Sequence, residues 1–225
     1  MTARKSFVRL IAEWPRRSKE LGWGFRVDEV WFEVPQSEVV DEMRRARRYW
    51  SWDVGLLTQL VERRGVGELT EFYWVWPDGR ERRYERFPDG VWRRLYMRRR
   101  MLYLGGLSLP RIHTFFSGDD PAAPHDHPFW FWTFPLRSYT EEVEEKDEIS
   151  RGPRAGRMYS EYSRARRTVR ALRPHFRTAE YRHVVLEPER PTTTIVIGGR
   201  VRRVWGFWPS PDEFVPNDQW THYEG

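Results

Sequence analysis

The sequence predicts a mainly β fold, a sandwich or barrel that is preceded by an N-terminal α/β extension. From about 107 to 216 the chain reads as short apolar runs separated by turn residues, and no helical pattern interrupts them. Two Pro-Asp-Gly turns, at 77–79 and 88–90, each follow an aromatic strand end and indicate successive hairpins. We therefore divide the chain into an extension with one main helix (1–67), a β-meander joined to the barrel (68–106) and the barrel (107–225).

The first residues of the extension fit a short helix. Over 5–14, the side chains of Phe7, Leu10 and Ile11 would lie on one helical face, and Pro15 follows the last turn. We therefore expect a helix over this segment.

Two further elements complete the extension. Residues 23–34 are rich in Trp, Phe and Val and are expected to be extended. Over 37–64 apolar residues recur at helical spacing, Ser37 is a suitable N-cap, and glycines follow the last residue. This pattern predicts one long helix, with its apolar stripe toward the core and the basic run at 44–48 toward solvent.

The barrel segment carries the turn signals of an antiparallel fold. Gly198 and Gly199 separate the apolar run 194–197 from the run 201–205, which predicts a tight hairpin. Strands are expected over 111–116, 128–136, 139–145, 157–162, 167–172, 181–187, 193–198 and 200–208.

Composition limits the classes of protein to which the chain can belong. Its 225 residues are 39% hydrophobic and 16% aromatic, with 13 Trp, which supplies the buried area of a folded core. The absence of cysteine excludes disulfides and thiolate metal sites. No apolar run has the length of a membrane span, and none has the position of a signal peptide. We expect a soluble cytoplasmic protein without a membrane partner.

The basic charge raises the question of nucleic-acid binding. The net charge is +6, and arginine-rich runs occur at 44–48, 98–100 and 164–167, several of them near aromatic residues. Acidic residues are scattered throughout the chain, however, and this net charge is modest for its length. We therefore expect a solvated, salt-bridged arginine surface and do not expect nucleic acid as a partner.

The most informative local feature is the run Pro-His-Asp-His-Pro at 124–128. Residues i and i+2 share a face of a strand, so His125 and His127 can direct two imidazoles to one point. A third histidine, His183, lies in a later strand-like run. Imidazoles that converge beside an apolar β-interior suit a transition metal. The sequence therefore predicts a shared metal site.

Five motifs follow one another in the C-terminal half of the chain. They are the run 111–116, His-Asp-His-Pro-Phe at 125–129, Tyr-Thr-Glu at 139–141, His183, and Trp-Gly-Phe-Trp at 205–208. In this combination they resemble the cupin superfamily, and within it small cupin-like proteins common in bacteriophage genomes. The resemblance implies a cupin-type double-stranded β-helix, that is, a jelly-roll barrel. For a phage-encoded protein it also implies the host cytoplasm.

The resemblance also implies a ligand set. His125 and His127 match the two histidines of the first cupin motif, and His183 matches the histidine of the second. Where that first motif has a glutamate, this chain has Phe131 and Trp132. The usual shell of three histidines and one glutamate is therefore incomplete.

Two ligand sets remain open. Three histidines with open coordination positions would bind a divalent transition metal such as Fe, Mn, Ni or Zn. Alternatively, Glu141 supplies the missing carboxylate, since Tyr139 and Glu141 share a strand face and both could approach the interior. His113 is a fourth ligand, a partner that orients another imidazole, or a packing histidine. Asp119 is expected to cap its loop, and Asp126 to point away from the site.

The strand that follows His127 sets the character of the interior. If alternation continues, Phe129 and Phe131 face inward, favour a partly hydrophobic ligand, and lower the pKa of the histidines by desolvation. If a bulge shifts the register, Trp130 and Trp132 face inward instead.

Three functions fit these features. The first is a mononuclear metal-dependent enzyme of the oxygenase type, in which Tyr139 or Glu141 supplies hydrogen bonds or transfers protons. The second is a metal-free cupin of the sugar-nucleotide epimerase or binding type. The third is a non-catalytic phage accessory or structural protein. We expect a small-molecule ligand as partner, with a homodimer as a further option.

Overall fold

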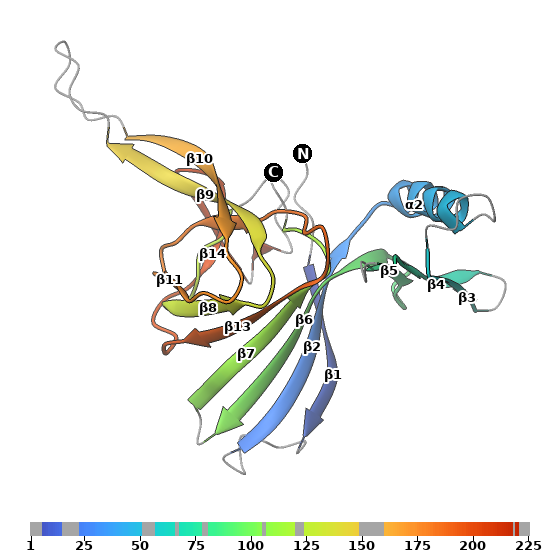
Figure 1. The fold of residues 1–225 in the computed structure, drawn as a ribbon, viewed down its shortest axis with the longest axis horizontal. Coiled ribbons are helices and arrows are strands. Elements are labelled where there is room, and N and C mark those ends of the chain that lie inside the picture. Colours follow the sequence, from blue (N-terminus) through green and yellow to red (C-terminus); the bar gives the residue numbers. More distant parts are fainter. Residues whose placement is uncertain are drawn as a thin grey trace.

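The computed structural model describes residues 6–14, 23–50, 57–65, 68–77, 81–104, 107–119, 124–148, 160–217 and 219–220. The chain is mainly β, as predicted, and its strands pair in antiparallel sheets (Figure 1). The elements are β1 (Ser6–Trp14), β2 (Trp23–Glu33), α2 (Gln36–Trp50), β3 (Gln59–Arg64), β4 (Leu69–Val75), β5 (Glu81–Arg86), β6 (Trp92–Leu104), β7 (Leu107–Phe115), β8 (Phe131–Pro135), β9 (Tyr139–Glu148), β10 (Ser160–Val169), β11 (His175–Arg177), β12 (His183–Val185), β13 (Thr192–Gly198), β14 (Gly206–Ser210) and β15 (Glu213–Pro216).

The larger sheet is built around the long strand β6. Its order is β11-β8-β13-β7-β6-β5-β4-β3, with β2 paired to β6 and β1 paired to β2. β7 pairs with the C-terminal part of β6, and β5 pairs with its N-terminal part. The predicted meander over 68–104 is confirmed, because β4, β5 and β6 pair in chain order. The division of the chain into three segments stays a prediction.

A smaller layer faces one end of this sheet. β10, β9 and β12 form a three-stranded sheet, and β14 pairs with β15. His125 connects the two groups, because its backbone forms isolated bridges with His183 in β12 and with Phe207 in β14. Figure 1 shows β9, β10 and β14 lying over β8 and β13.

The main core lies between the two layers. It combines Val30, Phe32, Tyr96, Met97 and Phe115 of the large sheet with Tyr139, Val169 and Val185 of the smaller one. Because both layers contribute to one buried apolar cluster, the residues that point inward from either layer are held in fixed positions.

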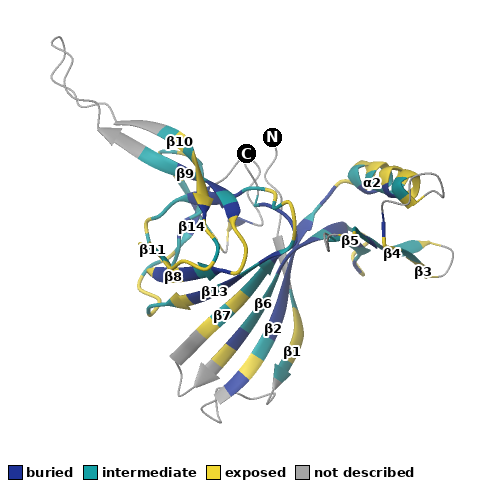
Figure 2. Cartoon of the chain, viewed as in Figure 1, coloured by how far each residue is buried: buried dark blue, intermediate teal, exposed yellow. Residues whose placement is uncertain are grey.

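The other end of the large sheet forms an arm, made of α2, β3, β4 and β5, with a core of its own. Val39 and Ala46 of α2 are buried against Phe72, Trp74 and neighbouring side chains. Exposed residues follow the outer side of α2, and buried residues mark the passage of β2 and β6 into the arm (Figure 2). The helix therefore buries its apolar stripe and presents its basic run to solvent, as expected. In the described part of the chain, no helix has the length and apolarity needed to cross a membrane.

The predicted helix over 5–14 is wrong, because these residues form β1. β1 pairs with β2 from Ser6 opposite Phe32 to Trp14 opposite Phe25, with an irregularity between Leu10 and Ala12. A short apolar run of this kind is compatible with the residue spacing of a helix and with that of a strand. Pairing with the neighbouring strand β2 decides in favour of the strand.

The predicted helix over 37–64 is correct only in its first half. α2 ends at Trp50, and β3 pairs with β4, placing Leu60 opposite Trp74 and Val61 opposite Tyr73. The residues between 51 and 56 lie outside the described part of the chain. The later apolar residues therefore belong to a strand, whose partner the sequence pattern does not reveal.

The predicted hairpin at Gly198 and Gly199 is also wrong. β13 pairs with β7 and β8, and the residues after it do not return along it. Gly198 has a different reason to be glycine, since a Cβ there would collide with the ring of Phe129.

Candidate metal centre

Three imidazoles converge beside β12. His125, His127 and His183 each offer one ring nitrogen, and these three atoms lie within 4.8 Å of one another. The Nε2 atoms of His127 and His183 are 3.0 Å apart. The ring centroid of His125 is 5.2 Å from that of His127 and 4.8 Å from that of His183. The prediction that the three histidines lie close together is confirmed, and they could hold a metal.

Backbone hydrogen bonds fix the loop that carries two of these rings. His125 N donates to His183 O at 3.0 Å, and His183 N donates to His125 O at 3.1 Å. His127 N donates to Ala179 O at 2.9 Å. The loop is thereby attached to the residues around β12, so the rings reach one point although 126–130 are not in a strand.

The aspartate between the two histidines faces the other way. Asp126 accepts hydrogen bonds from Gly206 N at 2.8 Å, from Arg203 Nη2 at 2.7 Å and from Trp208 Nε1 at 3.2 Å. It therefore anchors the C-terminal segment to the histidine loop. This agrees with the expectation that Asp126 points away from the site.

Glu141 lies behind His183. Its Oε2 atom accepts a hydrogen bond from His183 Nδ1 at 2.9 Å, and Oε1 accepts from Arg177 Nη2 at 2.7 Å and from Tyr181 Oη at 2.5 Å. Burial alone would raise the pKa of Glu141, but these donors and the charge of Arg177 lower it to about 2. An ionised carboxylate on Nδ1 leaves Nε2 of His183 as the acceptor, which is the form that binds metals.

A second carboxylate lies near His125. The Oδ2 atom of Asp119 is 3.7 Å from His125 Nδ1 and accepts a hydrogen bond from Val185 N at 2.6 Å. Tyr96 donates its hydroxyl hydrogen to the other oxygen of Asp119. Asp119 therefore joins its loop to β12 and the histidine site, and the predicted loop cap at Asp119 is wrong.

The histidines open onto a cavity of about 250 Å³ between the two layers. Phe129 and Phe131 are buried and line this cavity, whereas Trp130 and Trp132 are 41% and 39% exposed. The uninterrupted alternation is therefore the correct one of the two registers considered. The remaining lining residues are Tyr96, Met97, Arg99, Arg111, His113, Phe115, Pro128, Thr133, Tyr139, Val185, Thr194, Val196 and Trp205.

The apolar surroundings hold the imidazoles of His125 and His127 neutral. Burial lowers the pKa of His125 to about 4, against the opposing charge of Asp119. Burial and the neighbouring histidines lower the pKa of His127 well below its usual value. Neutral imidazoles need no deprotonation before they bind a metal at neutral pH.

The two other predicted residues also line the cavity. Tyr139 is buried, and burial raises the pKa of its hydroxyl, which keeps it protonated. His113 contributes an imidazole whose Nε2 atom is buried without a hydrogen-bond partner. Neither residue belongs to the group of three converging ligands. Arg177, Tyr181, Arg99 and Arg111 were not predicted, because their positions depend on strand register.

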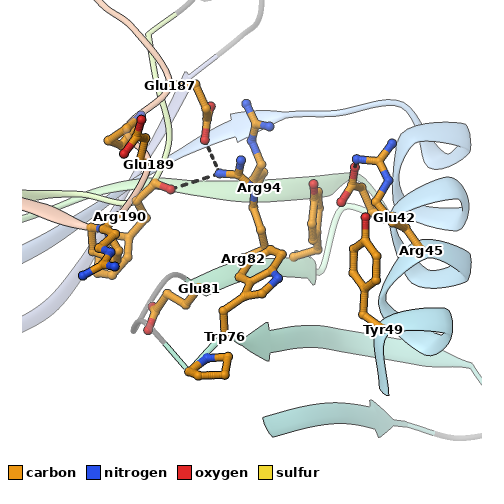
Figure 3. Close-up of a pocket in the computed structure, with 15 residues that line it drawn as sticks. Glu42, Arg45, Tyr49, Trp76, Glu81, Arg82, Arg94, Glu187, Glu189 and Arg190 are labelled. Atoms are coloured by element: carbon orange, nitrogen blue, oxygen red, sulfur yellow. Dashed lines mark hydrogen bonds and ion pairs between the residues drawn. The ribbon is translucent and has the colours of Figure 1, made fainter. Parts of the chain in front are cut away.

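A larger cleft, the α2 cleft, separates the arm from the loop at 187–191. Its volume is about 770 Å³, and Figure 3 shows glutamates and arginines on its walls together with Trp76 and Tyr49. Arg82 forms an ion pair with Glu187, and Arg45 forms one with Glu42 at 2.7 Å. This cleft has mixed, paired charges and no histidine among its described lining residues.

No protein-family model, curated protein or solved structure matches the chain.

Proposed function

We propose that this protein is a cupin-like jelly-roll protein that binds one divalent transition metal through His125, His127 and His183. We further propose that it is a mononuclear metal-dependent enzyme of the oxygenase type, acting on a small molecule with dioxygen as oxidant. The observation that carries the proposal is the convergence of three imidazoles beside a cavity whose lining is largely apolar.

The donor set fits a metal of the Fe, Mn, Ni or Zn group. Imidazole nitrogens suit these ions, and three protein ligands leave coordination positions for a substrate. Such a metal would supply Lewis acidity and, for Fe or Mn, redox chemistry toward dioxygen.

The chain's own residues have separate tasks in this proposal. Glu141 is a positioning residue, because it touches His183 and not the cavity. Tyr139 lines the cavity with a protonated hydroxyl, which can donate a hydrogen bond to a ligand. Phe129 and Phe131 form the apolar wall.

A second function, metal-free acid–base catalysis of the epimerase type, is favoured by one contact. The hydrogen bond between His183 Nδ1 and Glu141 Oε2 would also suit a general base, with Tyr139 as the acid. The cavity volume of about 250 Å³ is small for a sugar nucleotide, however. Metal content separates the two functions.

The test is elemental analysis of protein purified without a histidine tag. The proposal predicts a metal content of about one ion per chain. It also predicts loss of this metal in His127→Ala, because the two remaining imidazoles hold such ions weakly. The matched control is His175→Ala, since the His175 ring bonds to Arg170 O at 2.9 Å and lies outside the three-histidine group.

Two results would contradict the proposal. One is wild-type protein that takes up none of Fe, Mn, Ni or Zn after incubation with each ion. The other is equal metal content in His127→Ala and His175→Ala, which would locate the ion elsewhere.

A further inference from the structure

Two arginine side chains lie on the walls of the histidine cavity. Arg99 and Arg111 line the cavity, and none of the described lining residues is Asp or Glu. Arg99 Nη2 donates to Asp28 at 3.3 Å, and Asp28 also accepts from Arg26 at 2.8 Å. The lining histidines add no negative charge. A cavity of this composition attracts an anion.

Strand register gathers the basic groups at one place. In the β6–β7 ladder Arg99 lies opposite His113 and Met101 lies opposite Arg111. Arg111 and His113 are two residues apart on β7, so their side chains share a face. The charges of both arginines, after burial, lower the pKa of His113 to about 3, which agrees with this proximity. The three side chains therefore form one group on the large sheet.

The Nε2 atom of His113 has no hydrogen-bond partner among the described residues. His113 Nε2 is buried and forms no hydrogen bond, although it lines the cavity. A buried polar atom without a partner is destabilising, and a ligand that bonds to it would remove that cost. His113 is neutral, so its Nε2 can carry a hydrogen and donate it.

The rest of the wall is apolar and aromatic. Phe115, Phe129, Phe131 and Val196 line the cavity, and the guanidinium carbon of Arg111 lies 4.8 Å above the ring of Phe129. The volume of about 250 Å³ lies just below the range of drug-sized ligand sites. The space therefore suits a small flat molecule with one charged end.

We propose that the histidine cavity binds a small aromatic carboxylate, whose carboxylate group is held by Arg99, Arg111 and His113. Planar guanidiniums match the geometry of carboxylates. The inference deepens the proposed function by naming a substrate class. It rests on that function only for the identification of the cavity as the active site. The basic group lies on the large sheet, and none of its members belongs to the three-histidine group.

The test uses benzoate as probe and benzamide as its neutral counterpart of similar shape. Protein is dialysed against EDTA, and binding of each compound is measured by isothermal titration calorimetry. We expect benzoate to bind at least about tenfold more tightly, because hydrogen bonds to a charged group contribute that much to affinity. Equal affinities, or no benzoate binding, would overturn the proposal without any need for a variant.

Variants then locate the binding group. Arg111→Met should weaken benzoate binding about tenfold or more and leave benzamide binding little changed. The control is Arg100→Met, because Arg100 neighbours Arg99 on β6 but does not line the cavity and donates instead to Thr114 Oγ1 at 3.4 Å. Unchanged benzoate affinity in Arg111→Met would overturn the assignment.

The two proposals can fail separately. Metal uptake without discrimination between benzoate and benzamide would reject the carboxylate site and leave the metal centre standing. Benzoate binding that depends on Arg111, in a protein that takes up no metal, would retain the carboxylate site and reject the metal-dependent function.

Discussion

The histidine cavity and the α2 cleft show that volume alone does not identify a functional site. The α2 cleft has about three times the volume, at about 770 Å³ against about 250 Å³. Its charged side chains form ion pairs with each other, such as Arg45 with Glu42. In the smaller cavity, three imidazoles converge on one point, and the carboxylates that contact them lie outside the cavity lining.

The difference lies in how each region uses its charges. Ion pairs at an open cleft are screened by water and contribute little to stability or binding. A buried carboxylate behind a histidine instead fixes the orientation of that ring and leaves its other nitrogen available. The comparison predicts that equivalent substitutions in the two regions will have unequal effects.

The largest expected difference is between Glu141→Gln and Glu187→Gln. Glu141 is fully buried and accepts three hydrogen bonds, so removal of its charge leaves Arg177 and His183 with a poor partner. We expect the free energy of unfolding to fall by about 3–5 kcal/mol. The Glu187 side chain is 45% exposed and pairs with Arg82, so we expect a loss of at most about 1 kcal/mol.

Urea denaturation of both variants measures this difference. Metal titration of the folded variants extends it, since loss of the partner of a metal-binding histidine weakens metal affinity by about 10–100-fold. A Glu141→Gln variant with wild-type stability and metal affinity would remove the distinction between the two regions.

A smaller effect is expected from Tyr181→Phe, which removes one hydroxyl donor to Glu141. Hydrogen bonds to charged groups contribute about 1.5–3 kcal/mol, and the variant should lose stability within this range. The control is Tyr73→Phe, whose hydroxyl accepts from Gln59 Nε2 at 3.1 Å in an exposed pair. We expect that control to stay within about 0.5 kcal/mol of wild type. Equal losses in the two variants would contradict the account.

The last expected difference concerns acid sensitivity, and it develops only as pH falls. The pKa of His113 is about 3 in the folded protein against about 6.5 in an unfolded chain. The unfolded state therefore binds the proton first, so this contribution to stability is complete above about pH 6.5 and decreases as pH falls toward 3. Gln does not ionise, so His113→Gln should lose stability less steeply than wild type as pH falls below about 6.5.

Melting temperatures of the metal-free proteins between neutral pH and pH 4.5 measure this slope. Below 4.5 the protonation of Glu141, whose folded pKa is about 2, adds a second loss in both proteins. Parallel curves for wild type and His113→Gln above that pH would show that His113 has an ordinary pKa.

The sequence predicted the pair of His125 and His127 because its signal is local, and it added His183 from a later strand-like run and from the cupin resemblance. His125 and His127 are two residues apart, and the aromatic run after them indicated the cavity wall. The β-rich character also followed from punctuated apolar runs. The cupin resemblance and the roles of Tyr139 and Glu141 remain predictions.

The surroundings of the histidines depend on pairings that no local pattern contains. Glu141 reaches His183 because β9 pairs with β12, with Glu141 opposite Val185. Arg99 and Arg111 reach the cavity because β6 and β7 pair, although β6 was assigned to a separate segment. β1 was mistaken for a helix for the same reason, since its partner β2 decides its conformation.

Anomalous diffraction from crystals grown with the metal found in the purified protein tests the central claim most directly. The account predicts one strong peak within about 2.0–2.2 Å of a ring nitrogen of each of His125, His127 and His183. A peak at the α2 cleft, or no peak beside these three histidines in a protein that retains the metal, would contradict it.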